Sequence, residues 1–200
     1  MHFDFMFMGK EDEPGKLMTT LVVKEKKTKM KMASVVPTKS TGVSIIGRVV
    51  AFMKEIGIDA IDVVARSDQE PAVKRLIEEI GRRKGELGGR WMVESSPVGA
   101  SASNGRVERG IQSMQGQVRV MKSCLQEKWE IDIEADHMIM AWMVEYAAHL
   151  LNRFEVGKDG KTAYERCKGK KAKHMGVEFG EGILWRRKPV GGAPDKLGAL

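Results

Sequence analysis

In residues 2–8, phenylalanine alternates with other residues. This period of two predicts a β-strand, because alternate residues of a strand point to opposite faces of a sheet. One predicted face carries Phe3, Phe5 and Phe7. The other predicted face carries His2, Asp4, Met6 and Met8. One carboxylate therefore lies inside an otherwise apolar strand.

The segment that follows predicts two further strands and a helix. Leu17–Val23 and Met30–Val36 are rich in apolar and β-branched residues, and a lysine-rich turn separates them. Three strands in a row favour an antiparallel meander. Pro37 ends this run, and Thr41 is a suitable N-cap for a helix that extends to Gly57. Its apolar positions recur at helical spacing and are Val43, Ile46, Val50 and Met53.

A second pair of strands is predicted farther along the chain. Ile61–Ala65 is a short β-branched run, and Asp68 falls just past its end. A helix then follows, with apolar residues Val73, Leu76, Ile77 and Ile80. Trp91–Val93 predicts a fifth strand, and Ser95–Ser103 is rich in Ser, Gly and Pro, which is typical of a loop.

The longest predicted helix begins at Ser103 or Asn104. Its apolar face consists of Val107, Ile111, Met114, Val118, Met121 and Leu125. A polar stripe follows one residue later along the same helix and consists of Glu108, Gln112, Gln115, Arg119 and Lys122. A last helix is expected over Asp136–Phe154, with Ile139, Trp142, Met143, Tyr146 and Leu150 as its apolar members.

The order of these elements favours an α/β fold, with a mixed five-stranded sheet flanked by helices, of the ribonuclease-H-like kind. We expect residues 1–155 to form this core and residues 156–200 to form a basic, partly irregular C-terminal extension. The 200 residues, of which 42% are hydrophobic, suffice for one such core.

The distribution of charge changes this picture more than the net charge does. The formal charge is +7 and the pI is near 9.4. The stretch from Arg153 to Lys188 contains eleven Lys and Arg and five Asp and Glu. The stretch from Lys24 to Lys39 contains six lysines and one glutamate. Each stretch is compatible with a solvated face or tail, and nucleic acid is the leading alternative partner.

Other composition features exclude several classes of protein. Two cysteines, Cys124 and Cys167, are too few for a disulfide framework, and the four histidines show no zinc-ligand spacing. The sequence contains no apolar run long enough for a membrane span and does not open like a signal peptide. We therefore expect an intracellular protein without a membrane partner.

Three acids stand where the predicted sheet could bring them together: Asp4 in the first strand, Asp68 past the fourth, and Glu108 early in the long helix. Phosphoryl transfer to DNA uses such acids to hold two divalent cations. Taken singly, Asp68 is also explained as a helix N-cap and Glu108 as a first-turn acid. Asp4 is harder to explain in that way, because burying a carboxylate costs free energy unless a metal or partner meets it.

Three segments resemble, in order and spacing, the acid-bearing segments of integrase catalytic cores from long-terminal-repeat retrotransposons, nearest the copia type. They are HFDFMFMG, RSDQEPAVKRL and SSPVGASASNGRVERGIQSMQGQVRVMK. The family pattern has Asp in a first strand, Asp in D-N-G-x-E-F and Glu in N-G-x-x-E-R, and Asp4, Asp68 and Glu108 occupy these places. GKTAYERCKGKKAKHMGVEFGE is similar to the T-P-Y-E-x-x-x-G-x-K stretch that follows the core.

The chain also departs from the family pattern. Gln69-Glu70-Pro71 follows Asp68 where the family has Asn-Gly, and Ala163 replaces the proline of Thr-Pro. The 39 residues between Asp68 and Glu108 exceed the usual spacing, and Gly81–Gly89 is the expected insertion. Only three residues precede Asp4, so we expect the family's zinc-binding N-terminal module to be missing.

The resemblance implies two Mg²⁺ or Mn²⁺ ions held by the three acids, trimming of DNA ends and strand transfer into target DNA. It implies DNA contacts along the long helix, at Asn104, Gln112, Gln115, Arg119 and Lys122. It also implies homo-oligomers in the full-length protein and action in the nucleus. Two alternatives stay open: a nucleic-acid-binding remnant without activity, and a related ribonuclease-H-like nuclease or transposase.

Overall fold

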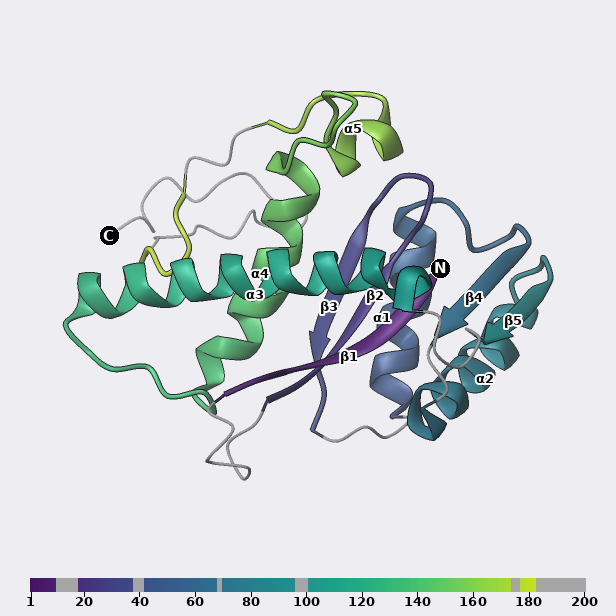
Figure 1. Cartoon of the computed structure of the whole chain (residues 1–200), viewed down its shortest axis with the longest axis horizontal. Helices are drawn as coiled ribbons and strands as arrows, with labels where there is room; N and C mark the ends of the chain where they lie inside the picture. Colours follow the sequence, from purple (N-terminus) through teal and green to yellow (C-terminus); the bar gives the residue numbers. More distant parts are fainter. Residues whose placement is uncertain (10–17, 38–41, 68–69, 96–100, 174–176, 183–200) are drawn as a thin grey trace, which may run out of the picture.

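The computed structural model describes residues 1–9, 18–37, 42–67, 70–95, 101–173 and 177–182, and its centre is a five-stranded sheet in the order β3-β2-β1-β4-β5 (Figure 1). β1 (His2–Met8) is the middle strand. β2 (Met18–Lys24) and β3 (Lys31–Val35) extend the sheet antiparallel on one side. β4 (Val63–Ser67) and β5 (Trp91–Ser95) extend it parallel on the other. The predicted meander and the predicted mixed sheet are therefore confirmed.

The helices cover both faces of this sheet. The described helices are α1 (Val43–Glu55), α2 (Pro71–Gly85), α3 (Ser101–Trp129), α4 (Met138–Phe154) and the short α5 (Ala163–Lys168). Figure 1 shows α3 lying across the front of the sheet, with its first turns near the N-terminus of β1.

Each face of the sheet has its own hydrophobic core, and the alternation along β1 divides its side chains between the two. The first core packs β1 against α1 and α2 and includes Phe3, Phe5, Val49, Met53, Leu76 and Ile77. The second core packs β1 and β2 against α3 and α4 and includes Met6, Val22, Met114, Val118, Met143 and Ala147. Since Asp4 shares the parity of Met6, it belongs to the face covered by α3.

Two predicted helix faces were partly wrong. In α1, Val43 is 88% exposed, and the buried residues are Ile45, Val49, Val50, Phe52 and Met53. In α4, Trp142 is 75% exposed, while Met140, Val144 and Ala147 fill the core. Both helices are apolar around more than half of their circumference, so spacing alone does not define which stripe meets the sheet.

Several element boundaries also differ from the predicted ones. β4 runs from Val63 to Ser67 instead of beginning at Ile61. Asp62 precedes the strand, and its carboxylate accepts hydrogen bonds from the backbone N–H (2.8 Å) and the side chain of Arg90. α3 begins at Ser101, before the expected start at Ser103 or Asn104. The predicted N-cap Thr41 lies outside the described residues, and Gly42 stands at the N-cap of α1.

The segment that we interpret as an insertion, residues 81–89, is anchored to the core by a buried lysine. Lys84 is fully buried in α2, and its Nζ donates hydrogen bonds to the backbone oxygens of Ile61 (2.7 Å) and Gly88 (2.8 Å). A buried ammonium is tolerated when polar groups meet it in this way. The end of α2 is thereby tied to the start of β4.

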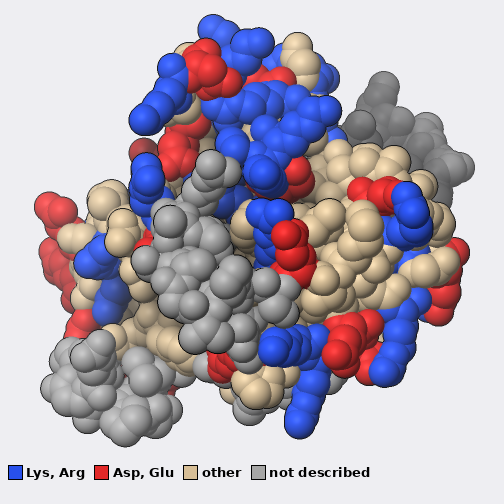
Figure 2. Space-filling model, turned by 45° about the vertical axis from the view of Figure 1, so that its right-hand side comes forward, with Lys and Arg blue, Asp and Glu red and all other residues tan. Residues whose placement is uncertain are grey.

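The basic C-terminal extension contains a helix that we did not predict. Thr162 and Glu165 form a capping box: the Glu165 N–H donates to the Thr162 hydroxyl (3.1 Å), and the Thr162 N–H donates to the Glu165 carboxylate (2.7 Å). The Thr-x-x-Glu spacing was the sequence signal for it. Ala163 is buried in the first core, so α5 packs on the domain. Figure 2 shows Lys and Arg side chains gathered at the end of the molecule where Figure 1 places α5 and the β2–β3 turn.

Among the described residues, no helix combines the length and the apolarity that crossing a bilayer requires.

Candidate active site

Asp4 lies in the central strand β1, opposite Val22 of β2. Its side chain is half-buried, and one carboxylate oxygen accepts a hydrogen bond from the Phe5 N–H (2.8 Å). The desolvation cost that we expected for a carboxylate among phenylalanines is therefore smaller than predicted, because Phe3 and Phe5 point to the opposite face. Asp4 is partly accessible on the face that α3 partly covers.

Asp68 lies outside the described residues. The strand that leads to it, β4, ends at Ser67 and runs parallel to β1, with Arg66 opposite His2. The Arg66 N–H donates to the Met1 carbonyl oxygen (2.8 Å), which continues this pairing toward the chain start. The first residues of β1 and the last residues of β4 are therefore adjacent.

Glu108 is exposed in the second turn of α3. The same turn lies over the first residues of β1 and the last residues of β2. A Cβ built at Gly110 would be 3.4 Å from the Lys24 Nζ, and Lys24 is paired with His2. Arg109 also lines a cavity together with His2 and Lys24. Asp4 is two residues from His2 and Glu108 is next to Arg109, so the fold brings both acids to one region.

The described residues do not by themselves complete a metal site. No group of three His, Cys, Asp or Glu side chains in the described part of the chain is arranged to hold a metal ion. Asp68, the third predicted ligand, is not in that part.

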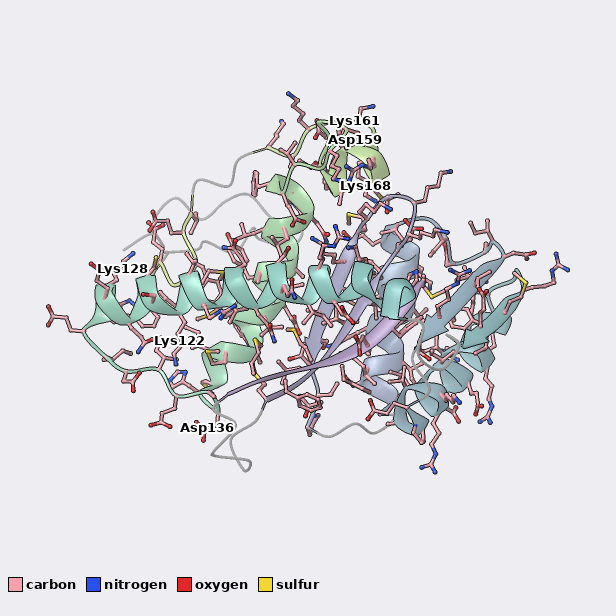
Figure 3. The ribbon with its side chains drawn as sticks, viewed as in Figure 1. Lys122, Lys128, Asp136, Asp159, Lys161 and Lys168 are labelled. Atoms are coloured by element: carbon pink, nitrogen blue, oxygen red, sulfur yellow. The ribbon has the colours of Figure 1, made fainter. Side chains whose placement is uncertain are left out.

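The predicted DNA-contacting residues extend along α3 away from Glu108. Gln112 and Arg119 are exposed, and Gln115 donates a hydrogen bond to the Phe7 carbonyl oxygen (3.4 Å) at the far end of β1. At a rise of about 1.5 Å per residue, Lys122 lies roughly 21 Å along the helix from Glu108. Figure 3 accordingly shows Lys122 in the half of α3 away from its first turns. Any DNA that contacts both must run along the helix.

Asn104 is in the first turn of α3, and its side chain lies outside the described part of the structure.

An ion pair between a buried lysine and an exposed glutamate supports the sheet beside this region. The Lys31 Nζ pairs with the Glu155 carboxylate, and the Lys31 side chain is 4% exposed. Burial alone would raise the pKa of Glu155, but its hydrogen bonds with Lys31 and with Ser113 of α3 outweigh burial and hold that pKa below its ordinary value. Glu155 therefore stays ionised near neutral pH and links α3 to β3.

Sequence reasoning missed some of the charged residues around the two acids. Arg109 follows Glu108 within the N-G-x-x-E-R motif, so its signal was present in the sequence. Lys24 was noted only as part of a basic stretch. Arg66 and Glu94 form an ion pair (Nε to Oε2, 2.6 Å) across β4 and β5, and nothing in the sequence marked them as partners.

The sequence matches no family model, and no similar sequence is found among curated proteins. Solved structures, in contrast, are similar. The catalytic core domain of BIV integrase aligns over 83% of this chain and 92% of that chain, with a TM-score of 0.55 and 14% identity. The HTLV-2 integrase catalytic core domain in complex with magnesium aligns over 83% and 93%, with a TM-score of 0.57 and 14% identity.

A chain of the simian T-cell lymphotropic virus intasome, in complex with PP2A regulatory subunit B56 gamma, aligns over 92% of this chain and 59% of that chain, with a TM-score of 0.61 and 12% identity. The protein thus has a ribonuclease-H-like fold. Within that class, its sheet order and flanking helices are those of retroviral-type integrase catalytic cores. At such identities the likeness concerns the fold, and the activity has to be argued from the site.

Proposed function

We propose that this protein is the catalytic domain of a copia-type retrotransposon integrase, a metal-dependent polynucleotidyl transferase that trims DNA ends and joins them to target DNA. The position of Asp4 carries the proposal: it is a carboxylate on the central strand, on the face that α3 covers. The turn of α3 that contains Glu108 lies over the same end of that strand.

Asp4, Asp68 and Glu108 would hold two Mg²⁺ or Mn²⁺ ions. Carboxylate oxygens are the ligands that these hard cations prefer. Asp4 fits this role because a central strand fixes its position while its side chain stays partly accessible. Glu108 fits because its side chain is exposed. When bound, such a pair of ions activates the attacking oxygen and stabilises the leaving oxygen of phosphoryl transfer.

The remaining residues bind and orient DNA. Gln112 and Arg119 present polar groups on the exposed side of α3, and Asn104 precedes Glu108 by one helical turn. Lys122 extends this row to the far half of the helix (Figure 3). Contacts of this kind fix the position of a strand without specifying its sequence, and holding the reacting groups in place lowers the barrier.

Two properties of similar structures support the proposal. The HTLV-2 core was obtained in complex with magnesium, in a trimeric and in a dimeric form. The simian T-cell lymphotropic virus protein is part of an intasome. We extend these properties to this chain as proposals: magnesium binding, self-assembly, and DNA as the substrate, with action in the nucleus.

A second candidate function is a nucleic-acid-binding remnant without catalytic activity. It is favoured by Gln69-Glu70-Pro71, which directly follows Asp68 where the family has Asn-Gly. Pro71 restricts the backbone of the preceding residue, Glu70.

A strand-transfer assay on the purified chain with Mn²⁺ separates the two candidates. Metal-dependent joining of an oligonucleotide to target DNA supports the enzyme. DNA binding without joining, under conditions in which a complete integrase is active, supports the remnant.

A further inference from the structure

A strongly basic cavity of about 340 Å³ opens beside the proposed acid site. Four separate parts of the chain line it: the start of β1, the end of β2 with the β2–β3 turn, α3, and the loop after α4. The lining residues are His2, Lys24, Glu25, Lys26, Lys29, Arg109 and Lys158. The lining thus contains five cationic side chains and one carboxylate.

The carboxylate, that of Glu25, accepts hydrogen bonds within the β2–β3 turn. Glu25 accepts hydrogen bonds from the Lys27 N–H (2.6 Å) and from the Thr28 hydroxyl (2.7 Å). Burial alone would raise the pKa of Glu25, but these hydrogen bonds outweigh it and keep the pKa below its ordinary value. Glu25 therefore shapes the turn and neutralises only part of the surrounding positive charge.

The cations of the cavity have few anionic partners. In the part of the chain that the structure describes, Lys26, Lys29, Arg109 and Lys158 form no ion pair. The pKa of Lys24 is lowered, first by burial and then by the neighbouring charge of Lys31. Positive charge thus exceeds negative charge among the lining residues, and an anion that enters would relieve the repulsion.

The cavity adjoins both described acids. His2 precedes Asp4 by two residues on the same face of β1, which is about 7 Å along a strand. Arg109 directly follows Glu108. Phosphates that neighbour the reacting phosphate along the same DNA strand can therefore reach the cavity.

We propose that this cavity binds backbone phosphates of a DNA strand and holds the strand beside the phosphate that reacts at Asp4 and Glu108. This inference rests on the proposed function, and it adds a strand-holding site formed by the β2–β3 turn, Arg109 and Lys158.

The chemistry of the lining favours a strand over a free phosphate ion. Four of the five cations are lysines, point charges on flexible stems, and Lys26, Lys29 and Lys158 are exposed. Such groups adapt to a chain of phosphates without reading its sequence. A compact anion site would instead use the fixed fork of arginines or converging backbone N–H groups.

The test uses the full chain and a double variant, Lys26→Gln with Lys158→Gln. Binding to a duplex oligonucleotide is measured by fluorescence anisotropy in EDTA, from about 50 to about 300 mM salt. We expect the slope of log K against log salt to become shallower by roughly 1 to 2, and Lys26→Arg with Lys158→Arg to retain the parent slope. Lys54→Gln with Arg75→Gln removes equal charge from exposed sites on α1 and α2, across the sheet, and should leave the slope unchanged.

A slope in the Lys26 and Lys158 glutamine variant equal to that of the parent overturns the inference. Binding of inorganic phosphate, measured by calorimetry, identifies the alternative ligand. If the variant loses phosphate binding while its DNA slope stays unchanged, the cavity holds a free anion and the inference is wrong. A strand-transfer assay on the parent separates the two proposals. A slope change without any joining by the parent rejects the proposed activity and leaves a DNA-binding cavity.

Discussion

Asn152 of α4 binds both backbone groups of Lys31 in β3, 121 residues away: the Lys31 N–H donates to Oδ1 (2.8 Å) and Nδ2 donates to the Lys31 carbonyl oxygen (2.7 Å). β3 is an edge strand of the sheet, and the amide side chain replaces a neighbouring strand at this residue. Asn152 is 5% exposed, so water does not substitute for it. The pair fixes α4 against the edge of the sheet.

Replacing Asn152 by alanine should reduce the free energy of unfolding by about 2 to 4 kcal/mol, because two buried backbone groups lose their partners. Urea denaturation followed by circular dichroism measures this change. Gln126→Ala, which removes an amide that bonds Asp132 near the surface, is the control and should cost less than about 0.5 kcal/mol. Equal losses for the two variants would contradict the role assigned to Asn152.

The ion pair of Lys31 and Glu155 predicts a pH dependence of stability. The pKa of Glu155 is lower in the folded protein than its ordinary value of 4.5. Its carboxylate therefore stabilises the fold above about pH 4.5, and this contribution is lost as the pH falls through the lowered value. We expect the free energy of unfolding of Glu155→Gln to change less than that of the parent between neutral pH and the acid range. Parallel pH profiles would show that the pair does not contribute.

Glu108→Gln should abolish metal-dependent joining while the fold and DNA binding persist, because the exposed side chain loses its charge without losing its shape. We expect the joining rate to fall by more than about 100-fold, since even residues that only orient metal ligands cost 10- to 100-fold. A strand-transfer assay with Mn²⁺ gives the rate.

The matched control for that variant is Glu127→Gln, another exposed glutamate of α3, in its last turn. It should join DNA at the parent rate. Joining by Glu108→Gln at the parent rate would show that Glu108 does not serve the reaction.

The basic C-terminal stretch should add salt-sensitive DNA binding, as its charge predicts. Deleting it from Arg153 onward would cut into α4 and remove the buried Ala163, so charge substitution is the cleaner test. Lys170, Lys171 and Lys173 are exposed, and changing all three to glutamine should make the salt slope of DNA binding shallower by roughly 2 to 3. An unchanged slope would indicate that DNA does not reach this segment.

Much of the fold could be predicted from the pattern of side chains. The alternation of side chains in residues 2–8 predicted β1 and both of its ends. The four apolar residues predicted for the core face of α2 are all buried. The stripe from Met114 to Leu125 on α3 is likewise buried. In the two helices one face is clearly more apolar than the other, so local periodicity already defines the side that is removed from water. In β1 both faces are covered, and the alternation defines which core each side chain joins.

The faces of α1 and α4 could not be predicted in that way. Val43 and Trp142 fit a helical spacing but point to solvent, since these helices have more apolar surface than the sheet covers. The edge contact of Asn152 also had no sequence signal, because its partner is 121 residues away. Such contacts depend on how elements approach one another in space.

The sequence by itself determined the identity of the three candidate acids and the elements that carry Asp4 and Glu108, because motif spacing and periodicity are properties of the chain. Only the tertiary structure decided that the turn of α3 with Glu108 lies over the end of β1 that carries Asp4. Only the tertiary structure assembled Lys24, Arg109 and Lys158 around one cavity. The physical reason is that packing of the two cores against the sheet fixes the approach of distant segments, and no local pattern encodes that approach.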